Sequence, residues 1–296
     1  MKNYILFFVA IAIFTFSCDY VTIPQQAGGS PVTPTSDTIR RILIEDFTGH
    51  TCQNCPSAAR MIDSLSQIFP GQIIGMGIHN DFFAEPCPPH QPPAGTFPAG
   101  AWAEDFRVLA EDADYNVTFG TNGFALPAGM INRDSILPSM EPTPVAAWPS
   151  KVAVILAKPI SAYIKLTPHY NSSTRALTVD VAGEFLQDTI GTFKVSLFLV
   201  EDGLTGYQLD NEVIPLGYQA NYDFHHVFRG SVDDNAGTIQ GVTVVTGTIP
   251  NHTGINYSSP AFTIPANYNA ANCKVVGILF KSTDYGVLQA AEADVQ

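Results

Sequence analysis

One stretch of the sequence constrains the fold more than any other: an apolar segment, two closely spaced cysteines, an amphipathic segment and a second apolar segment follow in direct succession. Residues 41–47 and 72–79 read as buried strands. Between them, residues 57–69 carry apolar side chains at helical spacing, and a Pro-Gly pair ends the pattern. Because a connecting helix normally leaves its two strands parallel, this order predicts a strand–helix–strand unit with Cys52 and Cys55 at the start of the helix.

The position of these two cysteines suits thiol–disulfide chemistry. A thiolate at a helix N-terminus faces unpaired backbone N–H groups and the positive end of the helix dipole, which lower its pKa. A second thiol one turn inside the helix can resolve a mixed disulfide. We therefore expect Cys52 to be the attacking thiol and Cys55 to be the resolving thiol.

The same residues resemble the thioredoxin fold, in which a CxxC pair starts the first helix directly after a strand. Asp46, six residues before Cys52, is similar to the buried acid that serves proton transfer in that fold. Residues 123–132 resemble the loop and strand that place a cis-proline against the redox cysteines, which implies that role for Pro127. The resemblance thus implies a catalytic set of Cys52, Cys55, Asp46 and Pro127.

Two departures from the thioredoxin pattern affect what the resemblance implies. Thr51 replaces the usual tryptophan before the first cysteine, and Gln53 with Asn54 replaces the usual Gly-Pro type of dipeptide. Both features tune the redox potential and the choice of partner. The direction of electron flow is therefore not implied.

A metal site is the alternative interpretation of the CxxC pair, because such a pair is also half of a zinc site. The sequence contains no second CxxC. The remaining ligand types nearby are His50, His79, Cys87 and His90, the last two in a Pro-rich insertion at about residues 81–100. The redox interpretation is preferred, with no metal ligand and no cofactor assigned. A zinc or copper site stays open.

The second half of the chain changes to a pattern of short strands separated by turn residues. The expected strands are residues 162–167, 176–184, 192–201, 224–230, 242–248, 261–264, 273–282 and 287–291. Seven or eight strands without helices predict an antiparallel sandwich of immunoglobulin-like size. A helical stretch at about 144–157 closes the part before it. The predicted fold class is an α/β thioredoxin-like domain at 39–159, followed by an all-β immunoglobulin-like sandwich at 160–296.

Two features of the second half bear on possible sites. His225 and His226 fall within an expected strand, where adjacent side chains point to opposite faces and cannot easily share one metal ion. Cys273 begins another expected strand. We expect Cys273 to be a buried thiol, the alternative being a disulfide with Cys87.

The first residues resemble a bacterial lipoprotein signal. A short basic start is followed by an apolar run from Tyr4 to Phe16, which is shorter than the roughly 20 residues of a membrane-spanning helix. A small residue then precedes Cys18, as in a lipobox. We expect cleavage of residues 1–17, lipid on Cys18 and a tether at 18–38; an ordinary secretory signal is the alternative.

The charge of the chain excludes one class of partner. With 27 acidic against 14 basic residues, the formal net charge is -13. Such a chain is not expected to bind nucleic acid or to carry a polybasic membrane patch.

The lipobox and several later segments, taken together, resemble the family called outer-membrane-protein-28-related. The resemblance rests on the lipobox and on residues 45–56, 131–133, 225–229 and 287–290. It implies an outer-membrane-associated lipoprotein and leaves the activity open. The predicted function is an envelope-anchored lipoprotein that exchanges thiols and disulfides with exported proteins. The alternative is a surface binding or adhesion lipoprotein whose Cys52 and Cys55 form a structural disulfide.

Overall fold

The computed structural model describes residues 39–88, 97–134, 136–137, 141–215 and 217–296. The described residues belong to one compact unit. The signal peptide, Cys18 and the tether expected at 18–38 lie outside them. No helix among the described residues has the length and apolar character needed to cross a membrane.

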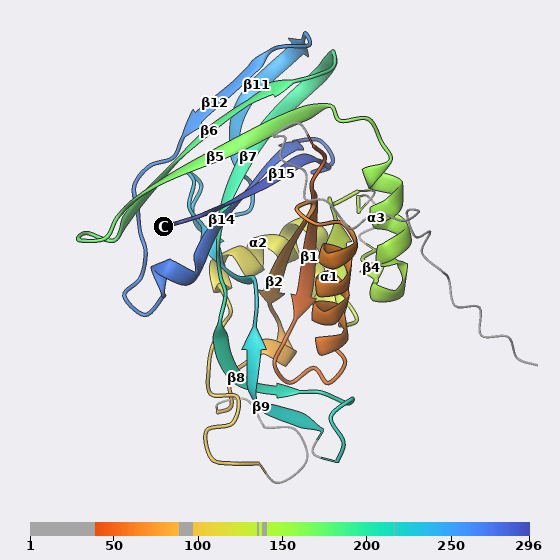
Figure 1. The fold of residues 1–296 in the computed structure, drawn as a ribbon, viewed down its shortest axis with the longest axis vertical. Coiled ribbons are helices and arrows are strands. Elements are labelled where there is room, and N and C mark those ends of the chain that lie inside the picture. The colour runs from red at the N-terminus through yellow and green to blue at the C-terminus, as the bar shows by residue number, and fades with distance from the viewer. Residues whose placement is uncertain (1–38, 89–96, 135, 138–140, 216) are drawn as a thin grey trace, which may run out of the picture. The chain divides into compact units, whose positions relative to one another are not determined.

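A nine-stranded mixed sheet forms the centre of the fold (Figure 1). Its strand order is β15 (Val287–Asp294), β14 (Cys273–Lys281), β7 (Thr189–Glu201), β10 (Val227–Ser231), β2 (Ile73–His79), β1 (Ile42–Thr48), β3 (Ala128–Ile131) and β4 (Thr143–Pro144), while β11 (Val242–Ile249) also pairs with β7. The strand β2 is parallel to β1 and to β10, and the other pairs are antiparallel.

Two smaller sheets complete the β structure. One contains β5 (Ala162–Asn171), β6 (Ala176–Phe185), β12 (Gly254–Ser258) and β13 (Phe262–Thr263). Its apolar side chains share a buried core with those of β7, β14 and β15. The other is an isolated hairpin of β8 (Leu204–Leu209) and β9 (Tyr218–Phe224), which projects from the lower end of the ribbon in Figure 1.

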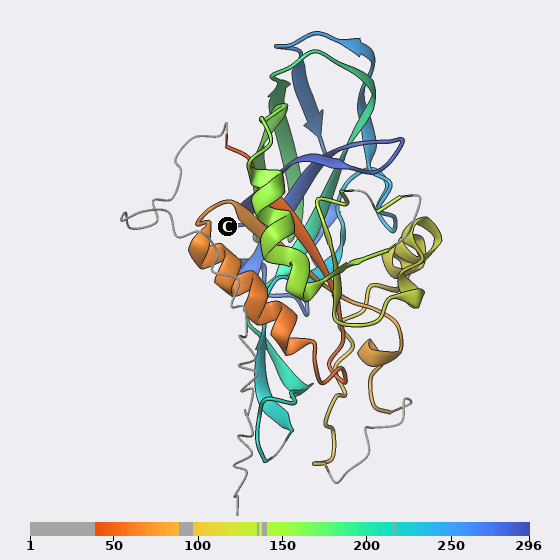
Figure 2. The ribbon, with the colours of Figure 1, turned by 90° about the vertical axis from the view of Figure 1, so that its right-hand side faces the viewer.

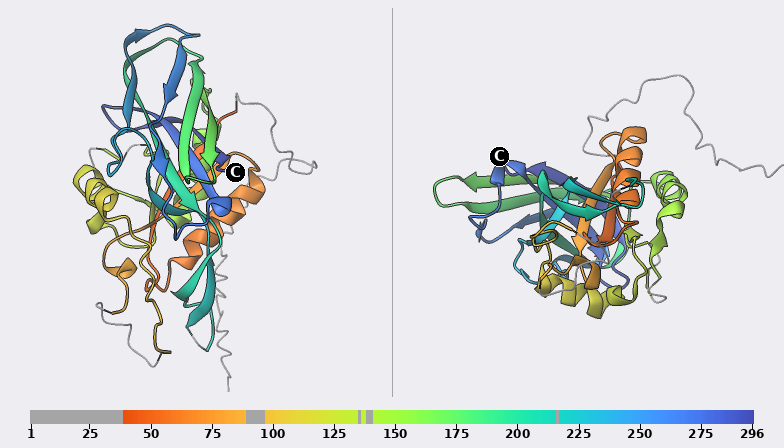
Figure 3. Two further views of the ribbon diagram at one scale, coloured as in Figure 1. Left: turned by 90° about the vertical axis from the view of Figure 1, so that its left-hand side faces the viewer. Right: turned by 90° about the horizontal axis from the view of Figure 1, so that it is seen from below.

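Three α-helices among the described residues pack on the part of the sheet formed by β1 and β2. On one face, α1 (Pro56–Ile68) and α3 (Trp148–Leu156) bury apolar side chains against Ile42 and Ile44 (Figure 2). On the other face, α2 (Leu109–Phe119) packs Tyr115 and Phe119 against Leu43 and Phe47 (Figure 3). The alternation of side chains along β1 therefore gives both of its faces a helical cover.

The N-terminal end of β1 is fastened to the C-terminal part of the chain. The carbonyl of Ile39 accepts a hydrogen bond from Gln289 Nε2 at 2.7 Å. The Arg40 guanidinium donates to the carbonyls of Lys158 at 3.2 Å and Leu288 at 3.3 Å. The first and last described strands are thus joined by side chains at this end.

The predicted fold class is wrong. The strand–helix–strand unit forms as expected, but the thioredoxin-like domain expected around it does not. Residues of both expected parts make up one mixed sheet, because Val227 of β10 pairs with Gly77 of β2. One apolar core also joins side chains of β1 and β2 to those of β7, β14 and β15. The domain boundary proposed between residues 159 and 160 falls between α3 and β5 and stays a prediction.

Candidate functional site

Cys52 and Cys55 are joined by a disulfide in the turn between β1 and α1. Cys55 directly precedes Pro56, the first residue of α1, as the sequence predicts. The turn is held by hydrogen bonds from Cys52 N to the Gly49 carbonyl at 3.0 Å and from Cys55 N to the Cys52 carbonyl at 3.2 Å. The bonded pair therefore fixes a compact loop at the carboxyl end of β1.

The β8–β9 hairpin covers this loop. Leu209 N donates to the His50 carbonyl at 2.9 Å, and Gln208 Nε2 donates to the Cys52 carbonyl at 3.0 Å. Asn211 N donates to the Gln53 carbonyl at 3.1 Å. Only 5% of Cys52 and 2% of Cys55 is exposed.

An ion pair extends the cover onto α1. Arg60 lies 3.1 Å from Asp210 Oδ2 and 2.9 Å from Glu212 Oε1, measured from its two terminal nitrogens. The Asp210 side chain is 1% exposed, whereas Glu212 is largely exposed. The interaction of Arg60 with Asp210 is therefore better shielded from solvent than its interaction with Glu212. Sequence patterns alone did not identify Gln208, Asn211 or Arg60, because nothing local marks which loop a hairpin will contact.

Asp46 lies on β1 in alternation with Ile44, on the sheet face that α1 covers. It is 4% exposed, and its Oδ1 has no hydrogen-bond partner within the described part of the chain. Burial raises the pKa of this carboxyl well above its usual range. Tyr222 of β9 interacts electrostatically with Asp46. The pKa of Tyr222 is raised to about 12, mainly because the phenol is buried, and the negative charge of Asp46 adds to this rise.

Pro127 follows a cis peptide bond and directly precedes β3. Its neighbour Ala128 pairs with Phe47, the residue after Asp46. Pro127 therefore lies just before the strand that neighbours β1, which leads into the disulfide loop. The catalytic roles of Asp46 and Pro127 stay predictions.

Among the described residues, the expected alternative ligands form no metal site. Within the described ranges, no group of three or more His, Cys, Asp or Glu side chains could hold a metal ion, and His90 lies outside them. His50 Nε2 is 2.9 Å from the Glu85 carbonyl, so this nitrogen carries the proton. The ring of His79 meets Phe106 and Phe224 edge to face, and burial lowers its pKa to about 3.

The two other cysteines among the described residues, Cys87 and Cys273, are free and buried. The prediction of a buried Cys273 thiol is confirmed, and burial raises its pKa to about 12. The Cys87 side chain packs among aromatic residues of the hairpin and Trp102. Burial also raises the pKa of the Cys87 thiol, so neither thiol is activated as a nucleophile.

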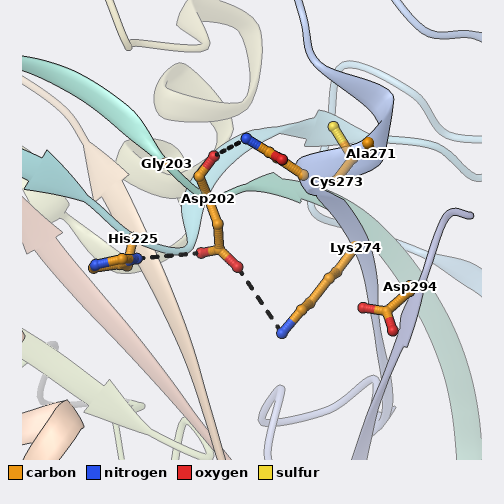
Figure 4. A pocket seen from close by; sticks show the side chains of 8 residues that line it. Asp202, Gly203, His225, Ala271, Cys273, Lys274 and Asp294 are labelled. Atoms are coloured by element: carbon orange, nitrogen blue, oxygen red, sulfur yellow. Dashed lines mark hydrogen bonds and ion pairs between the residues drawn. The ribbon is translucent and has the colours of Figure 1, made fainter.

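An open pocket of about 420 Å³ lies at the base of the hairpin (Figure 4). Asp202 lies between His225 and Lys274, 4.0 Å and 3.9 Å from their side-chain nitrogens. The prediction for the histidine pair is wrong: His225 and His226 lie between β9 and β10, and both contact Asp202. The left-handed backbone at His226, with φ of 54°, interrupts the strand there.

The fold and the site define a predominantly β protein with a covered disulfide at the start of its longest helix. The chain belongs to the family described as outer membrane protein Omp28, whose model matches residues 112–296. It is therefore an outer-membrane protein of the cell envelope, which confirms the family resemblance. The match begins within α2 and leaves out Cys52 and Cys55, so family membership alone assigns no role to the disulfide.

A comparison with solved structures gives a likeness in fold to HBP35. HBP35 of Porphyromonas gingivalis matches with a TM-score of 0.61 at 12% identity, covering 87% of this chain and 76% of that one. A domain of the outer membrane lipoprotein Omp28 from Porphyromonas gingivalis matches with a TM-score of 0.29 at 14% identity, covering 47% and 91%. No curated protein is significantly similar in sequence.

Proposed function

We propose that this protein is a lipid-anchored binding protein of the outer membrane in which Cys52–Cys55 is a structural disulfide. The observation that carries the proposal is the cover over the disulfide. Thiol–disulfide exchange requires a thiolate to reach a sulfur atom, and reactive cysteines are correspondingly partly exposed. Here both cysteines are buried, and the carbonyls of the loop are occupied by Gln208, Leu209 and Asn211.

Thiol–disulfide exchange is a second candidate, which one observation favours. Asp46 lies on the face covered by α1, and burial raises its pKa, as suits a proton acceptor for a cysteine at the helix start. This candidate requires the hairpin to move away before any client can react. The structural role requires no such movement.

Reduction assays on the mature chain separate the two candidates. We expect no catalysis of insulin reduction and no labelling of Cys52 or Cys55 by a maleimide under native reducing conditions that suffice to open exposed disulfides. The same labelling in denaturant is the control. We also expect a reduction potential below about -300 mV, as for structural disulfides of secreted proteins. Insulin reduction that disappears in Cys52→Ser would contradict the structural role.

The binding role is tested on cells. Lipid-free protein should adhere saturably to cells that lack their own copy, and the Cys52→Ala/Cys55→Ala double variant, if folded, should adhere equally well. Adhesion that depends on the cysteines would instead indicate capture through a mixed disulfide. The anchor is tested by fractionation: wild-type protein should sediment with membranes, and Cys18→Ala should not. Unchanged sedimentation of the variant would contradict lipidation at Cys18.

A further inference from the structure

The β8–β9 hairpin has little support of its own. Its two strands pair only with each other among the described strands, and the register shifts between Gly206 and Gln208. An isolated two-stranded hairpin is at best marginally stable in water. The position and stability of this hairpin therefore depend on its contacts with other parts of the chain.

The hairpin belongs to a small unit with its own apolar cluster. Tyr207 and Tyr218 of the hairpin pack with Trp102, Phe97 and Cys87, and no residue of α1 or of the larger sheets joins this cluster. We call the hairpin together with Cys87 and residues 97–102 the cap. At its base the hairpin is also held by a second cluster, in which Leu204, Tyr222 and Phe224 pack with Phe106 and with Val227 of β10. The base therefore stays attached to the large sheet, while the tip of the cap can leave the disulfide loop without exposing the first cluster.

The contact between the cap and the disulfide loop is polar. It includes hydrogen bonds from Gln208, Leu209 and Asn211 to loop carbonyls and a bond from the Asn211 side chain to that of Asn54. The cap also reaches α1 through the Arg60 ion pair. A neutral hydrogen bond contributes little net stability, and only where donor and acceptor are aligned. The carbonyls of His50, Cys52 and Gln53 are held in alignment by the loop that the disulfide closes.

Both ends of the hairpin offer places to bend. Before β8 comes Asp202–Gly203, where Gly203 has φ of 71°, and after β9 comes His225–His226. The open pocket lies at this base, lined by Asp202, Gly203 and His225 (Figure 4). Hinge residues are typically a few element-terminal positions that absorb backbone rotation.

We propose that the cap is a redox-dependent cover that docks on the loop while Cys52 and Cys55 are bonded and undocks when they are reduced. The proposal rests on the structural role of the disulfide in holding the loop. In the reduction, a small dithiol attacks one sulfur and forms a mixed disulfide. Its second thiol then displaces the cysteine, so that the dithiol becomes a disulfide and Cys52 and Cys55 gain two electrons and two protons.

Thermodynamic linkage makes the coupling between cap docking and disulfide formation reciprocal. If the bonded loop binds the cap more tightly than the reduced loop, the docked cap must equally stabilise the bonded state against reduction. Weakening the docking contacts should therefore make the disulfide easier to reduce. Gln208→Met keeps the length of the side chain and removes the donor to the Cys52 carbonyl, with Asn221→Leu, which removes an exposed amide from β9, as the matched control.

Hydrogen exchange of the mature chain, followed by mass spectrometry, tests the proposal. On reduction by dithiothreitol, with both thiols verified by mass, amides of β8 and β9 should exchange roughly 5- to 150-fold faster. Amides of β5 and β6 should not change. Gln208→Met should be reduced faster than Asn221→Leu. Unchanged exchange in β8 and β9 on full reduction would overturn the proposal, as would equal rates for the two variants.

The outcome of the hydrogen-exchange experiment is separable from the outcome of the insulin-reduction assay that tests the proposed function. Insulin reduction reports whether the pair is catalytic, whereas hydrogen exchange reports whether the cap responds to it. An inert disulfide with an unresponsive hairpin overturns the cover alone. Catalysis with a responsive hairpin overturns the inert disulfide of the proposed function, whereas the disulfide still holds the loop and the cover stands.

Discussion

At the scale of single residues, the fold buries several polar and charged side chains. Glu45 and Arg133 form a fully buried ion pair at 2.6 Å, and Tyr115 donates to the same carboxylate at 2.6 Å. The sequence pattern drew attention to both ends of this pair, at residues 45–56 and 131–133. It could not join them, because their contact depends on the pairing of β1 with β3.

His79 gives a prediction for acid stability. Its pKa is about 3 in the folded protein against 6.5 for the free side chain, because burial disfavours the charged ring. The stabilisation by the neutral ring is therefore present above pH 6.5 and is lost as the pH falls from 6.5 toward 3. At pH 5 the loss amounts to about 2 kcal/mol. The variant His79→Phe places a ring that suits the neighbouring Phe106 and Phe224. Between pH 7.5 and pH 5, its free energy of unfolding in urea should fall by about 2 kcal/mol less than that of the wild type. Equal losses in both proteins would contradict this.

At the scale of elements, the success of prediction follows the strength of the local pattern. The segments β1, α1 and β2 were predicted within one or two residues, because each has a strong apolar period. The helix α2 and the strands β8, β9 and β12 were missed. In α2, Leu109 is 64% and Val117 80% exposed, so its apolar residues do not mark a single buried face. The order of strands in a sheet has no local signal at all.

The packing of η1 (Phe82–Ala84) against the disulfide loop leads to a second prediction. A Cβ added at Gly49 would lie 2.4 Å from the backbone carbon and oxygen of Phe83, so one of the two elements must move. Gly49→Ala should lower the free energy of unfolding by about 1–3 kcal/mol. The matched control is Gly123→Ala, where a Cβ meets nothing within 4 Å. Chemical denaturation with the same loss in both variants would contradict the steric argument.

At the scale of the whole molecule, one mixed sheet connects the two halves of the chain. The expectation of a separate α/β domain failed because β2 has β10 as a neighbour, and β10 is nearly 150 residues further along the chain. Apolar side chains of β2, such as Met76 and Ile78, share a core with Phe198, Phe228 and Ile278. Neither relation is visible in a window of sequence.

This connection predicts the behaviour of a truncated chain. Residues 39–159 alone would leave the edge of β2 unpaired and expose Met76 and Ile78. An unpaired apolar edge favours aggregation. We expect this fragment to show neither near-ultraviolet circular dichroism nor cooperative unfolding, whereas residues 39–296 should show both. A fragment with a cooperative transition would show that the first part folds independently.

The fastening of Ile39 and Arg40 has a mechanical consequence. The tether of a lipid-anchored chain would join the fold there, at the beginning of β1, while the disulfide loop and the cap lie beyond its other end. A load applied between such an anchor and a partner bound at the cap would run along β1, in line with the neighbouring strands β2 and β3. The hydrogen bonds of these strands would then share the load in shear instead of breaking one at a time, so that the fold can serve as a tensile link between a membrane and what it holds.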